Sequence, residues 1–290
     1  MTVINPPSAF DQPQFLNDFK KTADAIGAPY SETAILDTLK TFETCFKEGA
    51  VIWRTTNRPR DPVNYRFYLR RRLDTVHIAT QAGYLDPNDP MGQLWCDFHP
   101  ETGLVKTWVN LKGRRPVDDI LNAAVVPESV RAHAPTFHRL GLRLVRFLAV
   151  DYDGNSMNLY FTAPGPISET QAAQYTKLAQ CDPPTAQEYQ DMQTFLNPQG
   201  FAFAVTMEYT TGTIKRVAFY ALNLPANQLP VVNDRVLDFF AAAPSYDKHR
   251  TKNVAWSFGV GNKKYMKAES SYVGELATVL KDVGSPLSSP

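Results

Sequence analysis

The sequence predicts an α+β protein in which ten antiparallel strands close into a single barrel with helices around it. Two observations support this prediction. Strand-like segments recur in pairs around short turns, and helical patterns occupy the intervals between the pairs. The pairs begin near residues 50, 93, 142, 200 and 253, and a spacing of about 50 residues is typical of repeated structural units. Closure is favoured because it removes the exposed edges of so wide a sheet.

Helical patterns open the chain and separate the later strand pairs. Apolar residues recur at helical spacing over 11–27 and over 31–49, and a glycine ends each pattern. The residues that define these two patterns are Phe15, Phe19, Ala23, Ile26, Ile35, Leu39, Phe42 and Phe46. Later helices are expected at 169–179, 187–196, 231–243 and 273–283.

The strands are expected to form five hairpins, because each pair flanks a turn rich in Gly, Pro, Asn or Asp. The predicted pairs are 50–56 with 63–69, 93–98 with 104–111, 142–150 with 156–163, 200–209 with 213–222, and 253–260 with 265–272.

Side-chain alternation indicates what each face of the sheet contacts. In SMNLYFTA, residues 156–163, apolar side chains share one face, and hydroxyl and amide side chains share the other. The apolar face would pack beneath the helices, and the polar face would line the barrel. Alternation alone also fits a half-exposed sheet whose polar face meets solvent. The regular order of helices and hairpins favours the lumen.

Composition excludes several classes of protein. The 290 residues carry a net charge of +1, so there is no overall attraction to nucleic acid or anionic membranes. Three widely spaced cysteines, Cys45, Cys96 and Cys181, fit neither a disulfide framework nor a zinc site. No long apolar run or signal peptide is evident. We expect a cytoplasmic monomer with one domain over 1–290 and a loose tail over 281–290.

The polar face collects basic residues, an amide and a hydroxyl without an equal number of acidic partners. Its members are Arg66, Lys106, Asn158, Tyr160, Arg216 and Lys267. Such a set suggests an anion, and the fork of arginine suits phosphate. Taken singly, a lysine or arginine is more often a surface charge.

Four segments together resemble the ABBA-type aromatic prenyltransferases, whose fold is the PT barrel. They are VKTWVNL, VDYDGNSMNLYF, TTGTIKRVAFYALN and YMKAESSY, and they occur in the family's order. The resemblance covers nearly the whole chain. It implies five repeats of helices and paired strands around a lumen. It also implies transfer of an allylic prenyl group from its diphosphate to an electron-rich aromatic ring.

The resemblance implies roles for the basic face. Lys106, Asn158, Tyr160, Arg216 and Lys267 match residues that hold the diphosphate. Arg66 stands where some members have a magnesium-binding aspartate, as in the metal-independent branch. We therefore expect Arg66 to bind the diphosphate and no metal or other cofactor to be required. Ala204 replaces a phosphate-binding tyrosine of some members.

The resemblance also implies an acceptor pocket. Glu269 matches a glutamate that approaches the acceptor's hydroxyl, so it is the candidate base. Arg146 and Leu148 would form part of the acceptor wall. Aromatic rings that could shield the allylic cation are Trp53, Trp108, Tyr160, Tyr220 and Tyr265. Alternatives stay open: Glu269 could simply pair with Lys267, the tryptophans could be core residues, and Arg54 rather than Trp53 could point inward.

The predicted function is a Friedel–Crafts-type transfer of a dimethylallyl or geranyl group to a small aromatic molecule without Mg²⁺. The alternative is a barrel that holds a small aromatic ligand without chemistry. The cationic cluster beside Glu269 favours the enzyme, since a carrier of neutral aromatics would not need it. The sequence leaves the acceptor's identity open.

Overall fold

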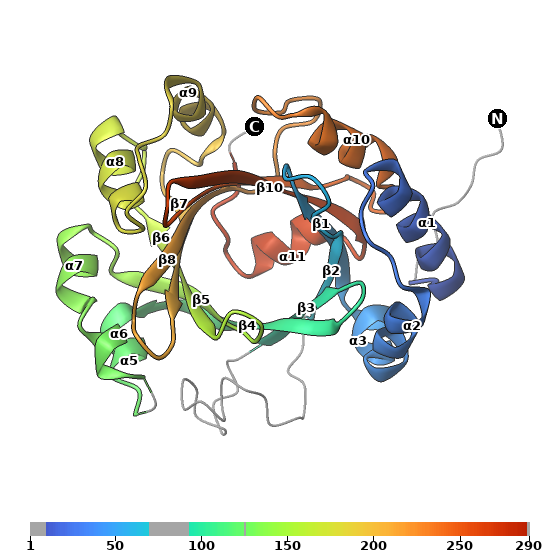
Figure 1. The fold of residues 1–290 in the computed structure, drawn as a ribbon, viewed down its shortest axis with the longest axis horizontal. Coiled ribbons are helices and arrows are strands. Elements are labelled where there is room, and N and C mark those ends of the chain that lie inside the picture. The colour runs from blue at the N-terminus through green and yellow to red at the C-terminus, as the bar shows by residue number, and fades with distance from the viewer. Residues whose placement is uncertain (1–9, 70–92, 125, 289–290) are drawn as a thin grey trace.

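The computed structural model describes residues 10–69, 93–124 and 126–288, and it confirms the predicted barrel. Ten antiparallel strands close in the order β1-β10-β9-β8-β7-β6-β5-β4-β3-β2. Every strand pairs with its sequence neighbours, and β1 pairs with β10 to complete the ring. Figure 1 looks down the barrel and shows the helices arranged around its outside.

The strands agree with the predicted segments to within a few residues, with one exception. Their bounds are β1 Ala50–Thr56, β2 Asn64–Tyr68, β3 Gln93–His99, β4 Gly103–Pro116, β5 Leu144–Asp151, β6 Ser156–Ala163, β7 Phe201–Glu208, β8 Ile214–Ala221, β9 Lys252–Gly259 and β10 Lys263–Val273. The exception is β4, which extends five residues past its predicted end at 111 after a break in register between Asn110 and Arg115.

The helices lie in groups between the hairpins. They are α1 Gln12–Ala25, α2 Glu32–Thr41, α3 Glu43–Glu48, α5 Val117–Leu121, α6 Glu128–Arg131, α7 Ala134–Arg139, α8 Glu169–Lys177, α9 Ala186–Phe195, α10 Asp234–Ala242 and α11 Leu276–Asp282. The single helical pattern predicted over 31–49 corresponds to two helices, α2 and α3. The short helices α5 to α7 escaped prediction because none completes two turns. No helix in the described ranges is long and apolar enough to span a membrane.

Most of the apolar core lies between the strands and the surrounding helices. On one side of the barrel, Phe15 and Phe19 of α1 pack edge-on against Trp53 of β1, with ring centroids 5.7 and 5.4 Å away. Full burial of such a side chain contributes about 1.5–3 kcal/mol to folding.

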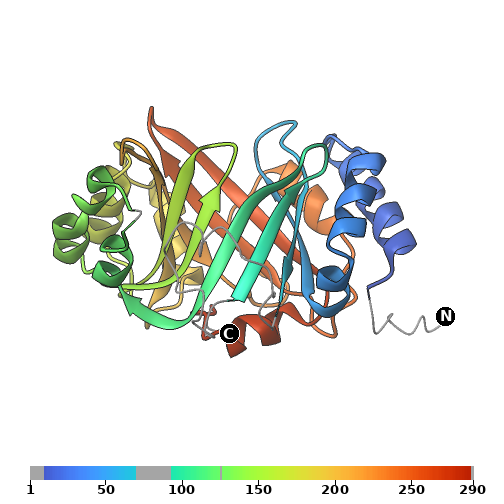
Figure 2. The same ribbon diagram turned by 90° about the horizontal axis from the view of Figure 1, so that it is seen from below.

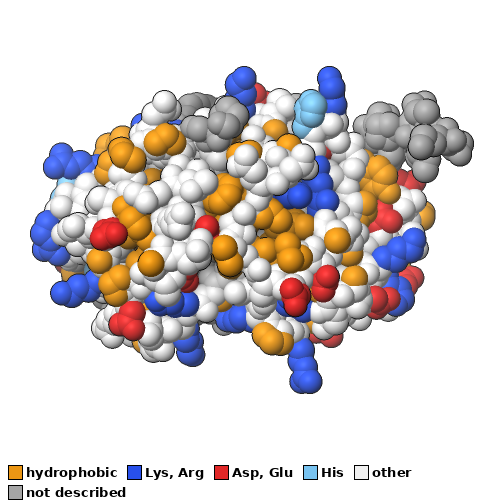
Figure 3. Space-filling model, turned by 90° about the horizontal axis from the view of Figure 1, so that it is seen from above, with side chains coloured by type: hydrophobic (Ala, Val, Ile, Leu, Met, Phe, Trp, Pro, Cys, Tyr) orange, Lys and Arg blue, Asp and Glu red, His pale blue; other side chains and the backbone are white. Residues whose placement is uncertain are grey.

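The outer surface carries charged side chains of both signs. Figure 3 shows acidic and basic side chains interspersed on one flank, as a near-neutral net charge would suggest.

One helix closes an end of the barrel instead of covering its side. The chain enters α11 directly after β10, at the end opposite the hairpin turns (Figure 2). Leu276, Val279 and Leu280 of α11 are buried in an apolar cluster inside the barrel. This helix forms the floor of the lumen.

The expectation of a loose tail over 281–290 was wrong for its described part. The amide of Ser288 donates to the carbonyl of Leu222, and Asn197 Nδ2 donates to the carbonyl of Leu287, each at 2.6 Å. Leu287 also forms an isolated bridge with Leu222. The segment is therefore held against the helix end of the barrel. Residues 289–290 lie outside the described range.

Candidate active site

The lumen contains two adjoining cavities with different linings. The first, which we call the polar chamber, has a volume of about 200 Å³ and is lined by Arg54, Thr55, Thr56, Arg58, Asp61, Pro62, Asn64, Lys106, Asp151, Arg216, Tyr265 and Lys267. The second, the aromatic chamber, has a volume of about 40 Å³ and is lined by Arg66, Tyr68, Trp95, Trp108, Phe147, Tyr160, Ala202, Tyr220, Leu222, Glu269, Leu280 and Ser285.

The chain's course places the two chambers at opposite ends. The polar chamber includes Arg58, Asp61 and Pro62 of the β1–β2 turn and Tyr265 near the start of β10, so it lies at the hairpin end. The aromatic chamber includes Leu280 of α11, so it extends toward the floor. A polar mouth thus leads to a deeper aromatic compartment.

Two buried lysines line the polar chamber. Lys106 Nζ lies 3.2 Å from a carboxylate oxygen of Asp151, and Lys267 Nζ donates to the hydroxyl of Tyr220 at 3.2 Å. Burial lowers the pKa of Lys106 to about 8, although Asp151 opposes this shift. Burial, with nearby Arg216 and other cations, lowers the pKa of Lys267 well below its usual value. An anion entering this chamber would favour the protonated, charged form of both lysines.

Within the described ranges, Arg216 is held by hydrogen bonds to neutral oxygen atoms and forms no ion pair with a carboxylate. Its Nη1 donates to the Tyr265 hydroxyl at 2.9 Å, and its Nη2 donates to Thr206 Oγ1 at 3.3 Å. Thr206 in turn donates to Asn158 Oδ1 at 2.6 Å, which turns the Asn158 amide so that Nδ2 has no partner among the described residues. Arg216 therefore places a positive charge at the wall of the chamber, which the carboxylate of Asp151 also lines.

A buried ionic network separates the two chambers. Arg66, 2% exposed, lies 3.2 Å from Asp97 Oδ2 and 3.7 Å from Glu269 Oε1, and it donates to the Tyr68 hydroxyl at 2.8 Å. Asp97 Oδ2 also lies 3.0 Å from Arg54 Nη2. Burial would raise the pKa of Asp97, but the two arginines outweigh burial and lower it. The network remains charged inside the protein.

Glu269 occupies the aromatic side of this network. Its Oε2 accepts a hydrogen bond from Asn253 Nδ2 at 3.0 Å. The side chains of Lys267 and Glu269 are on the same face of β10, one lining each chamber. No ion pair joins the two within the described ranges, because Lys267 Nζ bonds to Tyr220 instead. The alternative that Glu269 forms an ion pair with Lys267 is therefore not confirmed by the described residues.

Aromatic rings surround the space in front of Glu269. The rings of Trp108 and Tyr160 lie 4.4 Å apart, and those of Tyr160 and Tyr220 lie 5.9 Å apart. The guanidinium carbon of Arg66 lies 4.2 Å from the centre of the Trp108 ring. The Trp108 ring therefore already holds a cation by its face, and the compartment tolerates positive charge.

Two predicted pocket residues, Trp53 and Leu148, lie outside the barrel wall, and a third, Arg146, bonds to the floor of the lumen. Trp53 is fully buried outside the barrel wall, stacked on Tyr272 with ring centroids 4.7 Å apart. Leu148 belongs to the same outer core. Arg146 donates to the carbonyl of Val283 just after α11, so its bond goes to the floor of the barrel. Tyr265, in contrast to the deeper rings, lies at the mouth of the polar chamber.

Local backbone geometry explains these corrections. In β1, alternation places Arg54 inward and Trp53 outward, which is the alternative that the sequence left open. In β5, a register shift between Val145 and Phe147 makes Arg146 an extra residue. Phe147 then faces the aromatic chamber, and Leu148 faces out.

The basic face has more acidic partners than we expected, because Asp97, Asp151 and Glu269 lie beside its cations.

The sequence analysis did not assign several residues to the lumen. They are Arg54, Tyr68, Trp95, Asp97, Phe147 and Asn253. Alternation along residues 93–98 would have placed Trp95 and Asp97 on one face. The segment has no clear polar–apolar contrast, so the choice of face was undetermined. Of the predicted diphosphate ligands, Arg66 and Tyr160 line the aromatic chamber and not the polar one.

Comparison with known proteins agrees with this architecture. A family model described as "Aromatic prenyltransferase Orf2" matches residues 10–284. An aromatic prenyltransferase of Arthroderma otae is 54% identical, covering 96% of this chain and 94% of that protein. Another, of Sclerotinia sclerotiorum, is 46% identical over 99% of each. The 4-hydroxyphenylpyruvate 3-dimethylallyltransferase of Streptomyces niveus is 38% identical, covering 93% of this chain and 88% of that protein.

The closed antiparallel barrel, its charged lumen and these relatives define an aromatic prenyltransferase, so the protein is a transferase and not merely a carrier. More narrowly, the chain belongs to the aromatic prenyltransferase Orf2 family.

Proposed function

We propose that the enzyme transfers a dimethylallyl group from dimethylallyl diphosphate to a small hydroxylated aromatic molecule without a metal ion. The observation that carries the proposal is the division of the lumen, with cations at the hairpin end and a carboxylate among aromatic rings beyond them. The name of the relative from Streptomyces niveus supports a five-carbon donor and a phenolic acceptor. The small aromatic chamber favours the shorter of the two donors.

The polar chamber suits the diphosphate. When the donor ionises, its carbon–oxygen bond breaks and the bonding electrons leave with the diphosphate. Fixed positive groups stabilise that developing charge without reorganisation. Lys106, Arg216 and Lys267 are buried or half-buried in the chamber wall, and Asn158 offers an amide proton beside them. These residues are our proposed diphosphate ligands.

The aromatic chamber suits the allylic cation and the acceptor. Faces of Trp108, Tyr160 and Tyr220 would stabilise the cation by about 0.5–2 kcal/mol each and would exclude water. A ring carbon of the acceptor supplies the electron pair for the new carbon–carbon bond, and the ring then loses a proton. We assign Glu269 as the base that accepts the phenolic proton, and the proton lost from the ring carbon then returns to the phenol oxygen as the ring regains its aromaticity.

Arg66 supports a mechanism without a metal. It and Arg54 already hold Asp97, and a carboxylate that is engaged by two guanidinium groups is a poor ligand for a divalent cation. Arg66 also supplies fixed positive charge at the boundary between the chambers. We therefore assign Arg66 to charge compensation and to the positioning of Glu269, with the diphosphate on the other side of the network.

The proposal is tested by transfer assays with dimethylallyl and geranyl diphosphates against a panel of phenols, naphthols, indoles and phenazines. We expect dimethylallylated phenols, formed at a rate that excess EDTA leaves within about twofold. A rate that collapses in EDTA and returns with Mg²⁺ would overturn metal independence. Transfer confined to acceptors without a hydroxyl group would overturn the proposed acceptor class.

The low pKa of Lys106 leads to a prediction about pH. A bound diphosphate favours the protonated form of Lys106, so the pKa of this lysine rises on binding. The donor therefore binds with its full affinity only below the pKa of the free enzyme's Lys106, which is about 8. Above that pH the free lysine is mostly neutral, so each binding event requires the lysine to take up a proton from solvent. We expect the donor's KM to rise toward tenfold per pH unit between pH 8 and 9, and Lys267 contributes in the same direction.

The measurement is donor KM at saturating acceptor from pH 7 to 9.5. Lys106→Met should raise KM at pH 7 and make the profile less steep, because one of the two titrating groups is gone. A wild-type profile that stays flat through this range would contradict the assignment of Lys106 as a donor ligand.

A further inference from the structure

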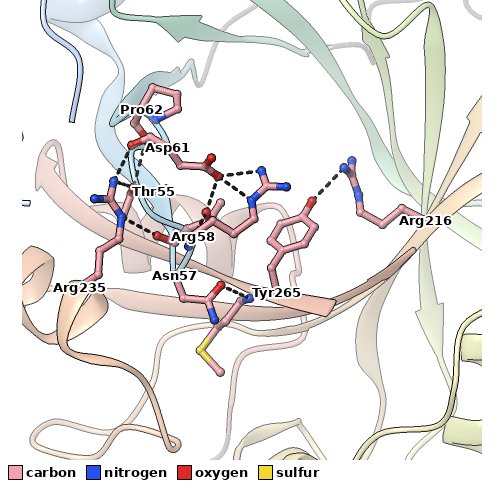
Figure 4. A network of polar contacts seen from close by, with 10 residues as sticks. Thr55, Asn57, Arg58, Asp61, Pro62, Arg216, Arg235 and Tyr265 are labelled. Atoms are coloured by element: carbon pink, nitrogen blue, oxygen red, sulfur yellow. Dashed lines mark hydrogen bonds and ion pairs between the residues drawn. The ribbon is translucent and has the colours of Figure 1, made fainter. Parts of the chain in front are cut away.

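The mouth of the polar chamber carries an arginine to which the mechanism has so far given no role. Arg58, in the β1–β2 turn, donates from Nε and Nη2 to Asp61 Oδ2 at 2.9 and 2.7 Å. Its guanidinium carbon lies 4.3 Å from the centre of the Tyr265 ring. The hydroxyl of that tyrosine accepts the hydrogen bond from Arg216 (Figure 4). Arg58 is thus joined through one ring to a proposed diphosphate ligand.

The backbone of this turn is anchored from outside the barrel. Arg235 of α10 donates to the carbonyls of Thr56 and Asp61 (Figure 4). It also donates to the carbonyl of Ile26. Asn233 Nδ2 donates to the carbonyl of Asn57 at 2.8 Å. The position of the turn is therefore fixed, and what can move is the side chain of Arg58, which is 53% exposed.

We propose that Arg58 is a further donor-binding residue, which exchanges Asp61 for the terminal phosphate of the bound diphosphate and thereby covers the mouth of the chamber. This inference rests on the proposed function. The exchange breaks one ion pair and forms another, and no covalent bond changes.

Charge and position both favour this exchange. An exposed arginine–carboxylate pair is worth only about 0.2–1 kcal/mol, whereas a diphosphate offers more charge and more acceptor oxygens to the same fork. Asp61 Oδ2 would keep the hydrogen bond from the Thr56 hydroxyl, so its carboxylate is not left unpartnered. Lys106 and Lys267 are only 5% and 8% exposed, so they lie deeper. Arg58 is placed to meet the outermost phosphate.

The same turn offers a matched control. Arg60 carries the same charge two residues away, but it lines a separate surface cavity with Gly27 and Asp238. Its backbone has φ of 62°, which asparagine tolerates better than most residues, so Arg60→Asn removes the charge with little strain. Comparing it with Arg58→Gln separates a specific contact from a change in the overall field.

The experiment measures binding of inorganic pyrophosphate by calorimetry and donor KM in steady state. Arg58→Gln should raise both constants by about five- to thirtyfold, and Arg60→Asn by less than twofold. Equal effects of the two substitutions would overturn the proposal. So would wild-type constants in Arg58→Gln while transfer continues. Failure of the wild-type protein to use any allylic diphosphate would instead overturn the proposed function and this inference with it.

A double-mutant cycle tests the exchange itself. Asp61→Asn releases Arg58, so it should lower the pyrophosphate Kd by about two- to fivefold. In the Arg58→Gln background the same substitution should change Kd by less than twofold, because there is no ion pair left to break. An equal gain in both backgrounds would show that Asp61 acts only as a repelling charge, and the exchange would be wrong.

Discussion

Replacing Glu269 with glutamine is expected to reduce transfer to phenolic acceptors by about 10²–10⁴-fold, which is the usual effect of removing a general base. Glutamine nearly conserves the volume of a side chain that is only 5% exposed, and it can still accept the hydrogen bond from Asn253. It cannot take a proton. The donor's KM should change little, because Glu269 lines the aromatic chamber and the diphosphate is assigned to the polar one.

Two controls make this result specific. An electron-rich acceptor without a hydroxyl group should lose much less rate in Glu269→Gln, since it has no phenolic proton for the carboxylate to accept. Circular dichroism and a thermal melt should show that the variant is folded. Undiminished transfer to phenols would restrict Glu269 to a structural partner of Arg66 and Asn253.

Substitution of Arg66 by methionine should destabilise the protein by about 3 kcal/mol, in the lower part of the range for breaking a buried ion pair. Asp97 is 1% exposed, and this change would leave its carboxylate with Arg54 as its remaining ion-pair partner. Arg54 moderates the loss but cannot replace the contacts that Arg66 makes with Asp97, Tyr68 and Glu269.

Urea denaturation measures this change through the free energy of unfolding. Asp97→Asn introduced into Arg66→Met should recover part of the loss, because a neutral amide costs less to bury than a carboxylate. The exposed Arg58→Gln should alter stability by less than about 1 kcal/mol. A loss below 1 kcal/mol in Arg66→Met, or no recovery in the double variant, would contradict the view that this network holds the barrel's interior together.

Alternation along regular strands allowed much of the barrel interior to be predicted. On β6 and β10 the polar face is continuous, and on β8 Arg216 and Tyr220 share a face opposite Val217 and Phe219. Asn158, Arg216 and Glu269 were therefore assigned correctly to the inside. This works because strand side chains alternate with a fixed period of two, and the hairpin turns were clear enough to locate each strand.

The predictions failed where the period or the contrast is lost. Residues 50–56, AVIWRTT, have no clean polar face, so the choice between Trp53 and Arg54 depended on pairing partners far along the chain. On β5 one inserted residue reversed the parity beyond Arg146. The docking of residues 285–288 depends on contacts with Leu222 and Asn197, which no local pattern could reveal.

The division of labour between the two chambers is the central claim, and a crystal structure with a non-ionising thiolodiphosphate analogue of the donor and a phenolic acceptor tests it most directly. We predict that the diphosphate contacts Lys106, Arg216 and Lys267 in the polar chamber. The allyl group should point toward Trp108, and the phenol hydroxyl should lie within hydrogen-bonding distance of Glu269. A diphosphate bound beside α11, or outside the barrel, would contradict the account.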